Sequence, residues 1–268
     1  MTESRIEPTA YTRLMASLRA DGARFAVDVP QDWRQGRTTY GGLAAALCLE
    51  SAQRAFPDLA PLRSAQIAFI GPADGVLAVE TSILRAGRSV TFVNADLSGD
   101  KGLAARAIFA FGAARESMFD RAFLPPPPMR PPEACEPYIP EGMGPPFAAH
   151  FDTRLAAGGR PGTGSSGSDL FLWVRHRDRA ATSPSALLAL ADMPPPAVMP
   201  MFPRFAPISS MTWGVNFLDA DASTEDGWFL LATKAENAAD GYSSQDMFVW
   251  ARDGRPLVAS RQSVAIFI

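Results

Sequence analysis

The sequence predicts an α+β fold built from two similar units, each an antiparallel sheet wrapped around one long helix. Three observations support this prediction: each half contains an apolar helical segment, each helix is followed by several strand-like runs, and a proline-rich segment separates the halves. We therefore place an N-terminal unit at residues 1–123, a linker at 124–146 and a C-terminal unit at 147–268.

Composition excludes several classes of protein. The 268 residues are 47% hydrophobic and 20% charged, which is typical of a globular chain with ample material for a core. A net charge of −3 and the lack of a Lys/Arg cluster argue against a nucleic-acid partner. The segment Met1–Pro8 has no apolar core and no apolar run reaches about 18 residues, so we expect neither a signal peptide nor a membrane span. Cys48 and Cys135 have neither metal-ligand nor disulfide-scaffold spacing, which favours a cytoplasmic location.

The first unit begins with a strand and a helix. Residues 23–29 alternate apolar and polar side chains as a half-buried strand does, and Pro30 ends the run. Residues 41–56 form an uninterrupted helical pattern whose first two turns are apolar on every face, which predicts burial. The pair Gly41 and Gly42 lets a ligand approach N–H groups that can hold negative charge, or lets another element pack closely.

Four strands follow this helix, and then the linker. The strand-like runs are 64–70, 76–86, 90–97 and 103–112, separated by turns rich in Gly, Pro and Asp. Ten prolines between residues 124 and 146 exclude regular structure and predict an extended linker.

The second unit repeats this order. Ser183 is a suitable N-cap and Pro184 a suitable first residue for a helix that ends at Asp192, where three prolines follow after Met193. The predicted strands lie on both sides of this helix, at 147–155, 170–175, 212–218, 228–234, 244–251 and 257–268. The two halves therefore form a degenerate internal repeat.

In order and spacing, this arrangement resembles the acyl-CoA thioesterase family, type II, over about residues 20–268. The resemblance implies a double hot-dog fold, in which two helix-in-sheet units of one chain pair as a pseudo-dimer. The matching segments are Tyr40-Gly41-Gly42, Leu62-Arg63-Ser64, Gly87-Arg88-Ser89-Val90, the helix ending at Asp192, Asp253-Gly254-Arg255 and Ala259-Ser260-Arg261-Gln262.

The resemblance also implies a set of site residues. In the family, an Asp after the second helix, a hydroxyl residue in the next strand and a Gln in the last strand hold a water beside the thioester carbonyl. Here these places fall on Asp192, on Ser210 or Thr212, and on Gln262. The segment around Ser210 departs from the family pattern, so either hydroxyl is a candidate.

The residues themselves support two of these assignments. A carboxylate at the end of a helix is disfavoured by the helix dipole, so Asp192 is either functional or simply exposed. Gln262 has the same parity as the apolar residues Val264, Ile266 and Ile268, so it points inward and needs a polar partner there, in the site or in the core.

The expected reaction is direct hydrolysis of an acyl-CoA. Asp192 would accept a proton from water, Gln262 and the hydroxyl would orient that water, and an N–H near Gly42 would receive the oxyanion. The resemblance places CoA phosphates near Arg88 and Ser89, although a surface salt bridge is an equal alternative for Arg88. We expect no metal and no cofactor, since CoA would enter only as part of the substrate, and we expect a homodimer or higher oligomer.

Two other functions compete with this one. A hydratase for enoyl thioesters would need a catalytic His in the loop before the first helix, but the only histidines are His150 and His176. An inert module that binds acyl thioesters without hydrolysing them is the second alternative, and the altered segment around Ser210 favours it.

Overall fold

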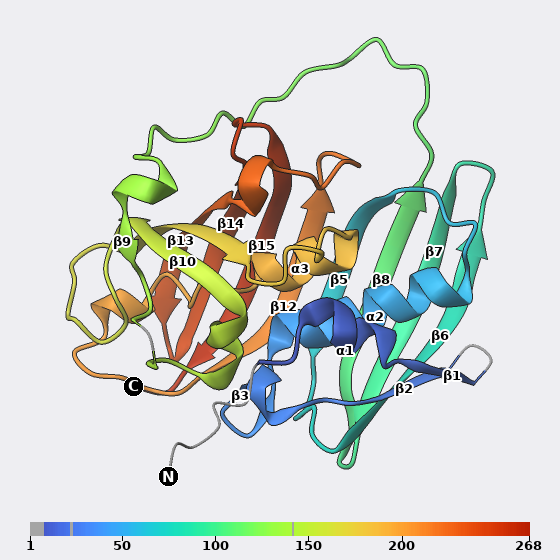
Figure 1. The fold of residues 1–268 in the computed structure, drawn as a ribbon, viewed down its shortest axis with the longest axis horizontal. Helices are drawn as coiled ribbons and strands as arrows, with labels where there is room; N and C mark the ends of the chain where they lie inside the picture. The colour runs from blue at the N-terminus through green and yellow to red at the C-terminus, as the bar shows by residue number, and fades with distance from the viewer. Residues whose placement is uncertain (1–7, 22–23, 141) are drawn as a thin grey trace.

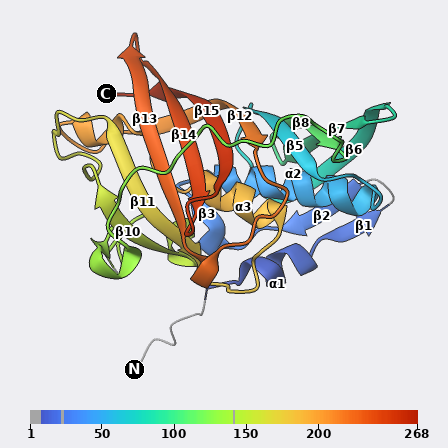
Figure 2. The ribbon, with the colours of Figure 1, turned by 90° about the horizontal axis from the view of Figure 1, so that it is seen from above.

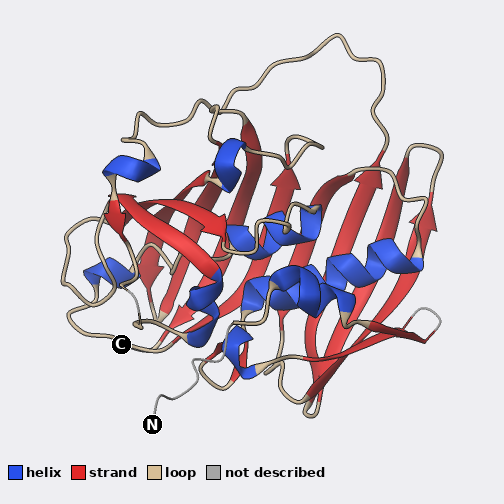
Figure 3. Cartoon of the chain, in the orientation of Figure 1, coloured by secondary structure: helices blue, strands red, loops and turns tan. Residues whose placement is uncertain are grey.

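A computed structural model of the chain describes residues 8–21, 24–140 and 142–268, and shows one large curved sheet that encloses two helices (Figures 1 and 3). The expectations for residues 1–7 and for Ala23 concern positions outside these ranges. The described part of the chain contains no helix that is long and apolar enough to cross a membrane. The predicted α+β double hot-dog fold is confirmed by this architecture.

The first half contributes six strands to the sheet, in the order β1-β2-β6-β7-β8-β5, and all neighbours are antiparallel. The predicted runs agree with these strands to within a few residues. The elements are α1 Tyr11–Ala16, β1 Arg19–Asp21, β2 Arg24–Asp28, β3 Arg34–Gln35, β4 Thr38–Thr39, α2 Gly41–Ala55, β5 Leu62–Phe69, β6 Val76–Ala86, β7 Val90–Gly99 and β8 Gly102–Gly112.

The second half contributes seven strands, in the order β12-β15-β14-β13-β11-β10-β9. Its elements are β9 Glu136–Pro137, β10 Phe151–Ala157, β11 Asp169–His176, α3 Pro184–Ala191, β12 Ile208–Phe217, β13 Phe229–Ala239, β14 Tyr242–Ala251 and β15 Pro256–Ile266. As predicted, Ser183 caps α3, since its hydroxyl accepts a hydrogen bond from the Ala186 N–H.

The two halves join edge to edge, as predicted, because β5 pairs with β12 in an antiparallel ladder centred on Gln66 and Gly214. From this junction the strand order reads the same way in both directions: β8, β7, β6 and β2 on one side, β15, β14, β13 and β11 on the other. Pairing these two edges removes both from solvent. The chain therefore has an approximate internal two-fold arrangement with β5 and β12 at its centre.

The helices α2 and α3 lie side by side on the concave face of the sheet, and α1 lies on their other side (Figures 1 and 2). They run in opposite directions, because Gly42 at the start of α2 lies against Ala189 near the end of α3. A Cβ on Gly42 would approach the Ala189 carbonyl oxygen to 2.6 Å. The Tyr40 hydroxyl donates to the same carbonyl at 2.7 Å. Gly42 therefore allows the close helix packing that the sequence left as one of two possibilities.

The proline-rich segment is more ordered than predicted. It contains a 3-10 helix at Pro132–Ala134 and the two-residue strand β9, so the expectation that prolines exclude all regular structure is wrong. Pro137 is tolerated because β9 is an edge strand. Two buried indoles hold the segment on the outer face of the second half: Trp173 Nε1 donates to the Arg130 carbonyl at 2.8 Å, and Trp250 Nε1 to the Leu124 carbonyl at 3.0 Å.

Two further corrections concern short helices. Residues 147–150, predicted as the start of a strand, belong to a 3-10 helix, and β10 begins only at Phe151. The helix α1 was not predicted. Its Tyr11 is buried against α2 and α3, so tertiary contacts stabilise a helix that is only six residues long.

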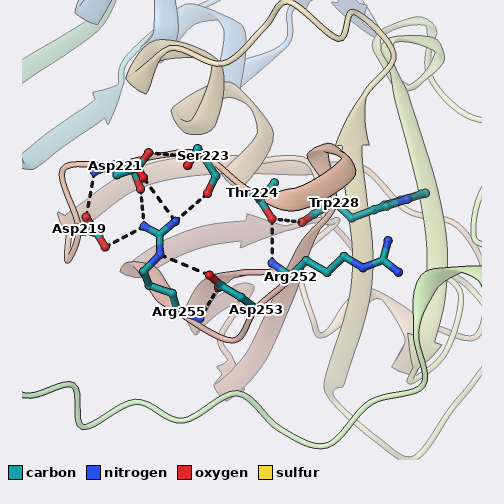
Figure 4. A network of polar contacts seen from close by, with 8 residues as sticks. All are labelled: Asp219, Asp221, Ser223, Thr224, Trp228, Arg252, Asp253 and Arg255. Carbon is teal, nitrogen blue, oxygen red and sulfur yellow. Dashed lines mark hydrogen bonds and ion pairs between the residues drawn. The ribbon is translucent and has the colours of Figure 1, made fainter.

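Arg255 ties the connection between β12 and β13 to the turn that precedes β15 (Figure 4). Its guanidinium donates to the Asp219 carboxylate at 2.8 Å and to the carbonyls of Asp221 and Ser223 at 2.7 and 2.9 Å. Several donors on one planar group suit such a cluster of acceptors. The Asp253-Gly254-Arg255 segment, noted in the sequence, is thus a structural clamp.

Candidate active site

A cavity of about 470 Å³ lies where the start of α2, the end of β5, the start of β8 and the start of β12 meet. Asp192, the residue that follows the last turn of α3, lines it. Its walls combine apolar and hydroxyl or amide side chains, among them Gln35, Thr38, Phe69, Ile70, Ile208 and Ser210. The cavity can therefore admit an apolar group beside a carboxylate.

Asp192 is held by groups from both halves of the chain. One carboxylate oxygen, Oδ1, accepts a hydrogen bond from Gln262 Nε2 at 2.9 Å, and the carboxylate also accepts the backbone N–H of Gly42. Burial raises the pKa of the Asp192 carboxyl to about 7, while the bonds from Gln262 and Gly42 oppose that rise. A carboxylate with this pKa can accept a proton near neutral pH.

Gly41 leaves room for Oδ2, the second carboxylate oxygen of Asp192. A Cβ at Gly41 would approach Asp192 Oδ2 to 2.9 Å, closer than real side chains tolerate. The start of α2 thus contacts Asp192 itself. The Gly42 N–H is already engaged by the carboxylate, and donation to a substrate oxygen by another N–H at the start of α2 stays a prediction.

The two candidate hydroxyls are separated by a bulge in β12. Ser210 lies opposite Val264, which is buried on the inner face, and lines the cavity. The register shifts between Ser210 and Thr212, so Thr212 lies opposite Ser263 and its side chain is exposed on the outer face. Ser210 therefore shares the cavity with Asp192, and Thr212 does not.

Gln262 points inward, as its parity predicted, and is only 3% exposed. Beyond its bond to Asp192, its Oε1 accepts a hydrogen bond from Gln245 Nε2 at 3.0 Å. We did not single out Gln245 from the sequence. The sequence did carry a signal, because Gln245 has the same parity along β14 as Ser243, Met247 and Val249, which are all buried.

Arg88 and Ser89 lie far from this cavity. They form the turn between β6 and β7, beyond the pair Val90–Gly112 at one end of the sheet. The cavity lies toward the other end, at Ala105, which is about 24 Å from Gly112 along β8. Arg88 is exposed there. Their expected role in binding the CoA phosphates of a substrate stays a prediction.

Both histidines belong to the core. His150 stacks on Trp33 with ring centroids 3.7 Å apart, and its Nε2 lies 3.1 Å from the Asp32 carbonyl oxygen. His176 Nε2 lies 2.9 Å from the Ala186 carbonyl oxygen, and burial lowers the pKa of His176 to about 4. Neither lines the cavity that holds Asp192.

A second polar group occupies the other end of the helix pair. Glu50, on α2, accepts a hydrogen bond from the Ser185 hydroxyl at the start of α3 at 2.9 Å, and the Tyr11 hydroxyl donates to Ser185 at 2.9 Å. Arg54 forms an ion pair with Glu50. In the approximate two-fold arrangement, Glu50 and the start of α3 are the counterpart of Asp192 and the start of α2.

The fold and the cavity define a double hot-dog protein with a half-buried carboxylate, Asp192, in a cavity at the junction of its two units. Two family models match the sequence: the acyl-CoA thioesterase N-terminal domain over residues 29–112 and the acyl-CoA thioesterase C-terminal domain over residues 126–266. The chain belongs to the acyl-CoA thioesterase family. A search of curated proteins found no significant match.

Solved structures share this fold at low sequence identity. A conserved protein of unknown function with a hot-dog fold from Alicyclobacillus acidocaldarius is 24% identical, with a TM-score of 0.87 and coverage of 95% of this chain and 97% of that one. A TesB protein from Mycobacterium avium subs paratuberculosis is 16% identical, with a TM-score of 0.78 and coverage of 97% and 100%. The acyl-CoA thioesterase II from Mycobacterium marinum is also 16% identical, with a TM-score of 0.73 and coverage of 94% and 96%.

Proposed function

We infer that this protein is a thioester hydrolase that converts an acyl-CoA and water into a free acid and CoA. The observation that carries this inference is the half-buried Asp192 carboxylate, with its pKa near 7, in a cavity that also exposes Ser210 and is large enough for an apolar group. Family membership supports the same substrate class.

In the proposed reaction, Asp192 takes a proton from a water whose oxygen attacks the thioester carbonyl carbon. The Gln262 bond fixes the carboxylate, and the Ser210 hydroxyl lies in the same cavity, where it can orient that water. The carbon–sulfur bond then breaks, and the proton on Asp192 passes to the departing thiolate. The start of α2, with its partial positive charge, favours the negative charge that develops beside it.

The test is hydrolysis of acyl-CoA substrates over a range of chain lengths by the parent and by Asp192→Asn. Loss of a general base should lower kcat about 10²- to 10⁴-fold without loss of the fold. Glu50→Gln is the matched control, since it alters the carboxylate at the other end of the helix pair and should leave kcat unchanged in the folded protein. A parent that hydrolyses none of the substrates would favour the inert binding module. Equal rates for Asp192→Asn and the parent would show that the base lies elsewhere.

A further inference from the structure

Gln245 extends the polar contacts of Asp192 into the core. It lies on β14, is 1% exposed, and faces Gln262 across the β14–β15 pair. Its Nε2 donates to Gln262 Oε1 at 3.0 Å, and its Oε1 accepts the backbone N–H of Ala197 at 2.7 Å. Gln245 is not in the cavity lining, so it does not contact a substrate there.

These contacts form a chain with one direction. The Ala197 N–H can only donate, so it selects the oxygen end of the Gln245 amide. The nitrogen end of Gln245 then faces Gln262 and selects the oxygen end of that amide in turn. The nitrogen of Gln262 is left facing Asp192, where the ionised carboxylate can only accept. A backbone donor thus determines the orientation of two side-chain amides.

The polypeptide backbone also connects the two ends of this series of hydrogen bonds. Asp192 and Ala197 belong to the same connection between α3 and β12, five residues apart, and the three prolines between them restrict its conformation. Asp192, at one end of the hydrogen-bond chain, and Ala197, at the other, are therefore joined through the backbone as well. A ring of this kind holds Gln262 in one rotamer and one amide orientation.

We propose that Gln245 is a positioning residue that holds the Gln262 amide with its Nε2 toward Asp192, and so keeps that carboxylate ready to accept a proton. The effect on turnover rests on the function proposed above, whereas the effect on the carboxylate does not. Among the described residues, the titratable group that interacts with Asp192 is Tyr40, whose pKa lies well above its ordinary value because the side chain is buried. Tyr40 therefore stays neutral in the range where Asp192 titrates.

The test is an NMR titration of the Asp192 carboxyl carbon in the full-length labelled protein, with the signal assigned by its loss in Asp192→Asn. Gln245→Met keeps a long unbranched side chain but removes the donor to Gln262. The Gln262 amide can then turn its oxygen toward Asp192, which disfavours the ionised carboxylate. The midpoint should rise above that of the parent, toward the value found in Gln262→Met, where the bond is lost entirely.

Ser243→Ala is the matched control, because Ser243 is a buried polar residue two positions away on the same face of β14. It should leave the midpoint unchanged. If Gln245→Met titrates like the parent while Gln262→Met does not, the proposal is wrong. The titration needs no turnover, so it is read even if the protein hydrolyses no thioester. If the protein does hydrolyse acyl-CoA, Gln245→Met should also lower kcat with little change in KM. The rising limb of its pH–rate profile should then move to higher pH.

A measurement on the parent covers the case in which Gln245→Met does not fold. The side-chain NH₂ protons of Gln262 and Gln245 should exchange with water more slowly than those of Gln66, which is exposed on the outer face. Exchange of the Gln262 protons as fast as those of Gln66 would show that its amide is not held, and would overturn the proposal.

Discussion

At the scale of single residues, the site is organised around a carboxylate whose environment opposes its charge. Burial acts against ionisation of Asp192, and the bonds from Gln262 and Gly42 act for it, so the group titrates near neutral pH rather than near pH 4. A base is most effective when its pKa lies near the pH at which it works. A carboxylate that the helix dipole disfavours is thus suited to accept a proton.

This balance predicts how activity depends on pH. Asp192 must be ionised in the substrate-free enzyme to act as the base. The value of kcat/KM for an acyl-CoA should therefore rise with pH and level off above about pH 7. Rates measured from pH 5 to pH 9, under conditions where the fold is intact, check this. Full activity already at pH 5 would contradict it.

The predictions from sequence succeed or fail at this scale for physical reasons. Inward parity identified Gln262, since a polar side chain among buried apolar ones needs a partner. The choice between Ser210 and Thr212 stayed open because a bulge moves one of them to the other face, and the sequence carries no signal for it. The role of Arg88 was inferred from the family resemblance alone and stays a prediction.

At the scale of elements, the helix pair sets the geometry of the site. The cap Ser183, Pro184 and the prolines after Met193 made the ends of α3 predictable, because these signals are local. The position of the proline-rich segment was not predictable, since it depends on contacts such as Trp250–Leu124 between residues far apart in the chain. The same reason explains why α1 was missed.

The two glycines at the start of α2 should respond differently to substitution by Ala. In Gly42→Ala the new methyl group meets the Ala189 backbone, which cannot move without separating the helices, so the melting temperature should fall by several degrees. In Gly41→Ala the clash is with the Asp192 side chain, so activity should fall more than stability. Thermal melts and acyl-CoA hydrolysis of both variants check this. Equal loss of activity and stability in the two would contradict it.

At the scale of the whole molecule, the outer face of the sheet differs between the two halves. The second half is covered by the proline-rich segment over Trp173 and Trp250. In the first half, Phe92 lies opposite Ala110 on the outer face and is 39% exposed. The strands at the two ends of the sheet, β1 and β9, have only three and two residues, which leaves little edge to pair with another chain.

Self-association remains a prediction from the sequence, and the outer face of the first half, which exposes Phe92, is one surface that can mediate it. Light scattering should give a mass of twice the 28.7 kDa of one chain, and Phe92→Lys should reduce it. A mass of 28.7 kDa for the parent at all concentrations would contradict this.

The contacts of Glu50 and Asp192 show that the two ends of the helix pair differ in chemistry. In a dimer of identical units, both ends of the helix pair would carry the same residues, and any change would alter both at once. Here one end carries Asp192, Gln262 and a cavity, while the other carries Glu50 bonded to Ser185 and paired with Arg54. Joining the units in one polypeptide lets their sequences diverge, so one junction can stay reactive while its counterpart becomes an anchor. We accordingly expect one reaction centre per chain. Substitutions at Glu50 should lower the stability of the protein rather than its turnover.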